Sequence, residues 1–147
     1  GSTRDSLSMD QRPRLWEIAA DAIAERPLLG HGFGREVIAK RFREGMGPEG
    51  YELGTHGHNL FVNAAVELGA AGLLALVALL AALALEHARN LSRPGTRVLG
   101  AIGLALLASF LVKNLTDDFF NRHNALVFWA LNGALVGLGR RPRGGGA

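Results

Sequence analysis

The sequence has 147 residues, of which 48% are apolar and 20 are glycine, and it carries a formal net charge of +3. This length fits one domain at most, and the apolar content excludes disorder throughout, because so much apolar surface requires burial. The absence of cysteine excludes a disulfide scaffold, a thiolate zinc site and a catalytic thiol. Charge is concentrated in residues 1–58, and most of the remaining residues are Leu, Ala, Val and Gly. Because the chain opens at Gly1 without a start methionine, we expect it to be part of a longer protein.

The first regular element is an amphipathic helix over residues 15–26. Apolar side chains recur along one face and acidic ones at every fourth position on the other; the two sets are Leu15, Ile18, Ala19, Ala22 and Ile23, and Glu17, Asp21 and Glu25. Proline is tolerated in a first helical turn and ends a helix that precedes it, so Pro13 and Pro27 set the expected bounds. Trp16 suits the level of lipid headgroups.

Glycine dominates the next segment. Residues 27–34 read PLLGHGFG, and a turn is favoured over a dinucleotide-binding loop because no strand precedes the glycines. Residues 35–43 are expected to form a short basic helix, and the glycine-rich residues 45–57 a loop.

Three apolar segments come next, at about residues 60–85, 98–113 and 124–139. The first exceeds the ~20 residues that cross a ~30 Å hydrocarbon core, and a chain this small could hardly surround it as a core helix. The other two are shorter, and the second crosses only if Arg97 and Lys113 extend their charges outward. The expected fold is an all-α, polytopic membrane protein in two parts: residues 1–58 as a helical loop region, and residues 59–147 as three transmembrane helices with a basic tail.

Arginines give the orientation. The loop after the first apolar segment and the tail after the third are basic through Arg89, Arg93, Arg97, Arg140, Arg141 and Arg143. Three crossings place these two segments on the same side, which the positive-inside rule makes cytoplasmic. Residues 1–57 and 114–124 are then expected outside.

The candidate catalytic residues lie where the glycine-rich loop meets the first apolar segment. Asn59 is a good helix N-cap, so His58 stands directly before a helix N-terminus, whose partial positive charge favours a neutral imidazole. A neutral imidazole is the form that a general base requires. His58 as a histidine at the lipid interface, and His56 with His58 as part of a metal site, remain open from the residues alone.

Asn59, Asn63 and Glu67 recur every four residues and form a polar stripe on the first helix. Polar groups at membrane depth face the protein interior or a water-filled cavity. We expect a structural role for Glu67, with Lys113 as a candidate ion-pair partner. Gly69 and Gly72 would permit a close helix neighbour.

Four motifs in this order resemble the C-terminal part of the O-antigen ligase family, which includes O-antigen polymerases and pilin O-oligosaccharyltransferases. They are R-x-x-x-W (Arg12, Trp16), the turn at 27–34, H-x-H-N (residues 56–59) and E-x-G-x-x-G (residues 67–72). The stretch NLTDDFF at 114–120, before a last helix containing Trp129, is similar too.

The resemblance implies a bacterial inner-membrane glycosyltransferase with a GT-C-like fold and a periplasmic active-site loop. Such enzymes move a glycan from an undecaprenyl-diphosphate carrier to an acceptor hydroxyl without a metal or other cofactor; in ligases the acceptor is a lipid A-core sugar. The family's essential histidine matches His58 best, with His56 second. Its diphosphate-binding arginine matches Arg12, and Asn59 joins the substrate-binding set. A second family arginine lies upstream of this sequence.

Two alternatives remain beside the ligase. The first is a polymerase or a protein O-oligosaccharyltransferase, which differs from the ligase in its acceptor: a second carrier-linked glycan or a pilin serine. The second is a non-enzymatic helical membrane module with a metal-binding loop. No nucleic-acid partner is expected, since the chain has few lysines and its arginines are scattered.

Overall fold

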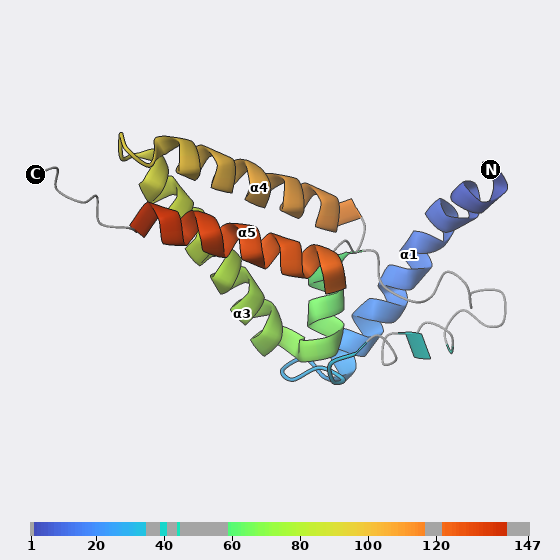
Figure 1. Cartoon of the computed structure of the whole chain (residues 1–147). Helices are drawn as coiled ribbons and strands as arrows, with labels where there is room; N and C mark the ends of the chain where they lie inside the picture. Colours follow the sequence, from blue (N-terminus) through green and yellow to red (C-terminus); the bar gives the residue numbers. More distant parts are fainter. Residues whose placement is uncertain (1, 35–38, 41–43, 45–58, 117–121, 141–147) are drawn as a thin grey trace, which may run out of the picture. The chain divides into compact units, whose positions relative to one another are not determined.

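The computed structural model describes residues 2–34, 39–40, 44, 59–116 and 122–140 (Figure 1). Over these residues the chain forms helices and turns without a strand, which confirms the all-α prediction for the described part. The helices are α1 (Ser2–Glu25), α3 (Leu60–Leu91), α4 (Arg97–Thr116) and α5 (Arg122–Arg140). Most of the basic helix expected over 35–43, and all of the loop expected over 45–57, lie outside the described residues.

The helices belong to two compact units. The first comprises residues 1–76 with 114–118, and the second comprises residues 77–113 with 119–147. Helix α1 and the first half of α3 therefore belong to the first unit, and the rest of α3, most of α4 and all of α5 belong to the second.

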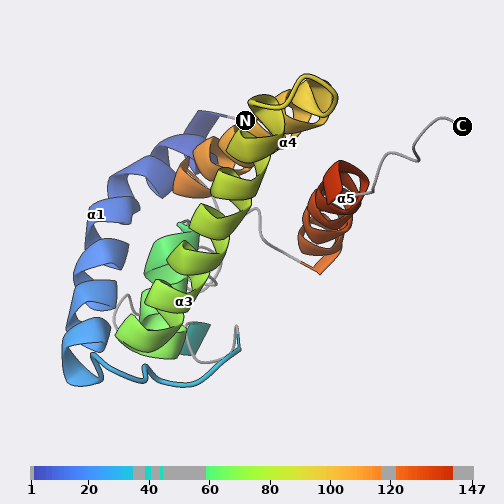
Figure 2. The same ribbon diagram turned by 90° about the vertical axis from the view of Figure 1, so that its left-hand side faces the viewer.

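Helix α1 is longer than the sequence predicts. It begins at Ser2 and includes Pro13 in its interior, as one continuous helix in Figures 1 and 2. The expected first turn at Pro13 is therefore wrong. Proline removes one helix hydrogen bond, but its fixed φ is itself helical, so helix can continue on both sides of it. The expected end is nearly correct, because α1 stops at Glu25, just before Pro27.

The first unit has its apolar core between α1 and the start of α3. Leu15, Ala19 and Ala22 of α1 are buried together with Val66 of α3. Three partly buried side chains, Ile18, Ile23 and Val62, pack against this cluster. The apolar stripe predicted for α1 is thus confirmed, and it is buried on the first two turns of α3.

Helix α3 contains a break that the sequence did not predict. Gly69 has φ 64° and ψ −164°, which are not helical values, and the green part of α3 changes direction in Figure 1. The uninterrupted part, residues 70–91, still rises about 33 Å at ~1.5 Å per residue. That length exceeds a ~30 Å hydrocarbon core, and its last turns carry Glu86 and Arg89.

Two helices in the described part of the chain are long and apolar enough to cross a membrane: α3 and residues 97–115 of α4. The third expected segment is helical and forms α5, but α5 contains too many polar residues to count as a candidate membrane span. A third crossing therefore remains a prediction.

In the second unit, α4 and α5 both pack against the end of α3. The Nε2 atom of His87 on α3 lies 2.8 Å from Oδ1 of Asn132 on α5. Phe110 of α4 stacks on Phe128 of α5, with ring centroids 3.9 Å apart. A Cβ at Gly103 would overlap the ring of His87, so this glycine allows α4 to approach α3 closely.

Candidate functional site

Asn59 caps the first turn of α3. Its Oδ1 accepts hydrogen bonds from the backbone N–H groups of Phe61 (2.9 Å) and Val62 (3.2 Å). These groups are among the first N–H donors of the helix, which have no intrahelical acceptor. The side-chain Nδ2 donates to the carbonyl of Leu115, 3.3 Å away, at the end of α4. The predicted N-cap is confirmed, and the same side chain also ties α3 to α4.

The polar stripe of α3 lies entirely before the break at Gly69. Asn63 is only 6% exposed and Glu67 is half-buried, so the stripe faces protein. The stripe belongs to the segment of α3 that packs on α1.

The glycine-rich turn at residues 27–32 is hydrogen-bonded into the break of α3. In an unbroken helix, the N–H groups of Ala70 and Ala71 would bind the carbonyls of Val66 and Glu67. Instead, Ala70 donates to the carbonyl of Pro27 (2.8 Å) and Ala71 to that of Leu28 (3.2 Å).

The two freed carbonyls are also used. Val66 accepts from the N–H of His31 (3.0 Å), and Glu67 accepts from the N–H of Gly32 (2.9 Å). Four hydrogen bonds to the turn thus replace two hydrogen bonds of the helix. The N–H groups of Ala70 and Ala71 and the carbonyls of Val66 and Glu67 all keep a partner. We call this arrangement the splice: residues 27–32 bonded to residues 66–71. Gly69 was expected to admit a neighbouring helix, and the structure shows that it admits this turn instead.

His31 holds the splice to α1, and the sequence alone did not single it out. Its side chain is 6% exposed, and Nε2 lies 2.7 Å from the carbonyl oxygen of Ala22. A carbonyl can only accept, so Nε2 carries the proton in this contact. Nε2 also lies 4.0 Å from a carboxylate oxygen of Glu25. The sequence feature that could have identified it is its position between Gly30 and Gly32. A large polar side chain between two glycines has few local neighbours, so its partner is expected elsewhere in the fold.

The residues predicted to carry the chemistry are described only in part. Arg12 lies within α1, so its backbone is helical, whereas His56 and His58 fall outside the described residues. Within the ranges that the structure covers, no three His, Cys, Asp or Glu residues are grouped to hold a metal ion. The metal-site hypothesis concerned His56 and His58 and is therefore untested.

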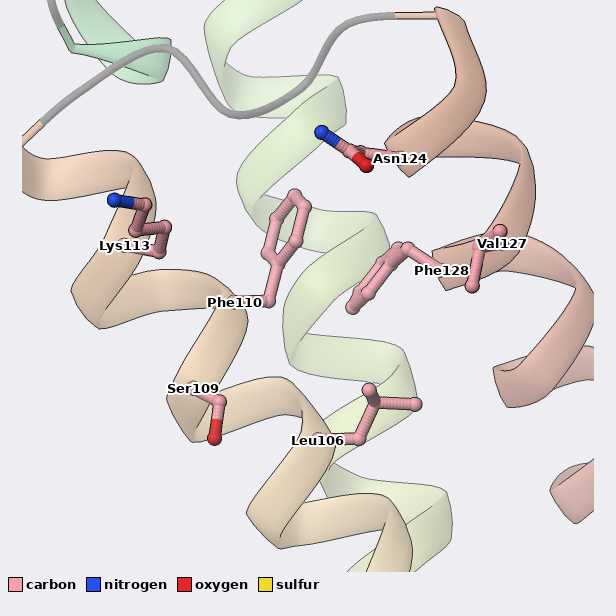
Figure 3. Close-up of a pocket in the computed structure, with 7 residues that line it drawn as sticks. All are labelled: Leu106, Ser109, Phe110, Lys113, Asn124, Val127 and Phe128. Atoms are coloured by element: carbon pink, nitrogen blue, oxygen red, sulfur yellow. The ribbon is translucent and has the colours of Figure 1, made fainter.

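A pocket of about 400 Å³ lies between α4 and α5 in the second unit (Figure 3). Figure 3 shows Phe110 and Phe128 turned toward one another, with Lys113 and Asn124 near one end. Its remaining lining residues are Leu106, Ser109 and Val127. This predominantly apolar lining suits hydrocarbon better than a sugar, so we do not place the transfer chemistry here.

Comparison with known proteins assigns the first unit. Residues 2–77, slightly more than half of the chain, match the protein-family model described as O-antigen ligase. No curated protein matches the chain. The matched residues nearly coincide with the first unit's main segment, residues 1–76, and include both sides of the splice. They end before 114–120 and the last helix, so that part of the resemblance lies beyond the match. The chain belongs to the O-antigen ligase family.

Proposed function

We propose that this chain is part of a membrane glycosyltransferase that joins a glycan to lipid A-core. The donor is a glycan on undecaprenyl diphosphate. The observation that carries the proposal is the family match over residues 2–77, which contains Arg12 and the H-x-H-N motif.

The proposed reaction is a displacement at the sugar's anomeric carbon. The acceptor hydroxyl oxygen forms the new bond to that carbon, and the bond from the carbon to the carrier's diphosphate oxygen breaks. His58 takes the hydroxyl proton, and undecaprenyl diphosphate leaves with the bonding electron pair. Arg12 binds the diphosphate, whose negative charge increases as the sugar departs.

The capping geometry of α3 supports His58 as the base. Asn59 caps α3, and His58 directly precedes it in the sequence. A helix N-terminus disfavours imidazolium, and a neutral imidazole is the form that accepts a proton. His56 is two residues further from the terminus and is the weaker candidate.

An ion-pair cluster supports the proposed topology. Arg140, at the end of α5, donates from Nε to Glu86 near the end of α3 (2.9 Å), and Arg89 approaches the same carboxylate at 3.5 Å. The ends of α3 and α5 therefore lie together, as they would if α4 and α5 each cross the bilayer. We place this basic end in the cytoplasm and residues 1–58 in the periplasm of a bacterial inner membrane.

The test is transfer by the full-length purified protein from an undecaprenyl-diphosphate-linked glycan to lipid A-core. His58→Ala should reduce turnover about 10²–10⁴-fold, as loss of a general base does, and His56→Ala should reduce it less. Membrane insertion should be normal in both variants. Near-normal turnover in His58→Ala would reject the role of this histidine.

Acceptor choice separates the ligase from its relatives. The same donor is offered with lipid A-core, with a second carrier-linked glycan, or with a pilin serine peptide. Transfer to lipid A-core alone supports the ligase; transfer to either of the others would assign the chain to the corresponding branch.

A further inference from the structure

The turn that forms one side of the splice exposes large apolar side chains. Leu28 is 70% exposed, Leu29 is 79% exposed and Phe33 is 84% exposed. We call these three residues the apolar tip. Single exposed apolar residues are common on protein surfaces, but three within six consecutive residues of one turn make this turn a candidate interaction surface.

The splice fixes the height of this tip along α3. The turn is bonded to residues 66–71, where the uninterrupted membrane-length helix begins. Residues 70–85 lie between the break and Glu86, the first charged residue after Leu68. At ~1.5 Å per residue they rise about 24 Å, most of a ~30 Å hydrocarbon core. The tip is therefore attached at the end of this uncharged stretch.

Five backbone groups of residues 27–32 are hydrogen-bonded within the protein. Non-helical backbone is tolerated at membrane depth only where its polar groups are satisfied within the protein. The carbonyls of Pro27 and Leu28 accept from α3, and the N–H groups of His31 and Gly32 donate to it. The N–H of Gly30 donates to the carbonyl of Arg26 (3.1 Å), and Pro27 has no N–H to satisfy.

The covering partner can be argued from these positions. Leu74, in the first turns of α3 after the break, is also 67% exposed. A helix of membrane length presents such residues to lipid. We infer that the apolar tip inserts into the outer leaflet of the membrane and contacts acyl chains, so that the splice is anchored from its own side of the bilayer. This inference rests on α3 crossing the membrane in the proposed orientation and not on the transfer reaction.

The experiment measures the surroundings of the tip in the full-length protein. Nitroxide labels are attached to Leu29→Cys and Phe33→Cys in a cysteine-free background, after reconstitution into phosphatidylethanolamine–phosphatidylglycerol vesicles. The present sequence contributes no cysteine of its own. Collision rates are measured with oxygen, which concentrates in lipid, and with a water-soluble nickel chelate. Leu74→Cys is the lipid reference, and Glu17→Cys, exposed on the polar face of α1, is the aqueous reference.

Insertion predicts that labels at 29 and 33 resemble the label at 74, with oxygen collisions exceeding nickel collisions several-fold. Nickel collisions as frequent as those at 17 would place the tip in water and overturn the inference. Low collision rates with both reagents would mean that protein covers the tip, which overturns it equally. If the label at 74 is as accessible to nickel as the label at 17, α3 does not cross the membrane there, and both the span and the insertion of the tip are rejected. Glycan transfer is measured on the same preparations, so retained transfer with an aqueous tip rejects insertion alone.

Discussion

Gly30 and Gly69 meet across the splice with nearly equal φ angles of 65° and 64°. A Cβ on Gly30 would overlap the carbonyl of Glu67 and the nitrogen of Gly69, and a Cβ on Gly69 would overlap the carbonyl of Leu28 and the nitrogen of Gly30. The backbone next to Gly69 therefore occupies the space where a side chain of residue 30 would lie, and the backbone next to Gly30 occupies the space of a side chain at residue 69. Both belong to motifs that carried the family resemblance, and the structure gives those motifs a shared physical purpose.

The first prediction concerns these two glycines. Gly30→Ala and Gly69→Ala should each destabilise the protein by more than the ~1–2 kcal/mol that a left-handed backbone costs an L-residue, because backbone atoms must also move apart. Thermal unfolding of the purified full-length protein in detergent measures the effect. Gly137→Ala is the matched control, since a Cβ there meets nothing within 4 Å and replaces a helical glycine. Equal unfolding temperatures for Gly69→Ala and Gly137→Ala would contradict the splice.

The second prediction concerns the cap at Asn59. Asn59→Ala should cost about 1 kcal/mol, a typical loss for an N-cap. Asn59→Asp keeps the accepting oxygen and should retain most of that stability, losing only the donor to Leu115. Unfolding and glycan transfer are measured together, because a substrate-binding amide would make Asn59→Asp inactive although folded. An unchanged stability in Asn59→Ala would show that the cap is energetically unimportant.

The third prediction concerns His31. His31→Ala should lower the unfolding temperature, because the carbonyl of Ala22 keeps only the longer bond from Arg26 N–H (3.4 Å) and a buried side chain leaves a void. His31→Gln places an amide N–H at about the same reach and should restore part of the loss. If alanine and glutamine lower the unfolding temperature equally, the hydrogen bond to Ala22 contributes nothing measurable.

The fourth prediction concerns the buried pair His87 and Asn132. Both are fully buried, and Asn132 Nδ2 also donates to the carbonyl of Phe128 (2.8 Å), which leaves its Oδ1 to accept from the imidazole. Asn132→Leu and His87→Leu should each cost ~1–3 kcal/mol by leaving a buried partner unsatisfied. The double variant should cost less than their sum, and a double-mutant cycle gives the coupling. Strict additivity would show that the two side chains do not interact.

The fifth prediction concerns Arg12. Planar bidentate donors suit diphosphate, and lysine supplies only a point charge, so Arg12→Lys should lose much of the transfer activity. Arg14→Lys is the control, two residues along the same helix, and should remain active. Donor binding is measured in parallel with a chelator present. Wild-type binding and turnover in Arg12→Lys and Arg12→Ala would exclude the role, and loss of wild-type activity on chelation, restored by a divalent ion, would assign the diphosphate to a metal.

Local patterns predicted the helices well. The apolar stripe of α1 and the cap at Asn59 depend on residues a few positions apart, and periodicity and capping chemistry report such relationships directly. Pro13 shows the limit of a local rule. Proline removes one helix hydrogen bond, yet α1 continues through this residue.

The break at Gly69 was not predictable in this way. It depends on hydrogen bonds between residues 27–32 and 66–71, which are far apart in sequence and involve backbone atoms that every residue shares. The sequence shows these glycines, but it predicted a helix contact at Gly69 and a separate turn at residues 27–34. Nothing in the local pattern indicated that the two segments bind each other. His31 was missed for the same reason, since its acceptor is a carbonyl of α1.

The splice also determines where the chain can change length. Pro27 and Leu28 are bonded in step with Ala70 and Ala71, and His31 and Gly32 in step with Val66 and Glu67. An insertion or deletion inside either segment would shift donors past their acceptors and leave backbone groups unpaired. A change of length between Gly32 and Asn59 does not shift these bonds, and the entropic cost of closing a loop rises only with the logarithm of its length. Homologous chains can therefore differ in the number of residues before Asn59 more readily than in the spacing within either segment.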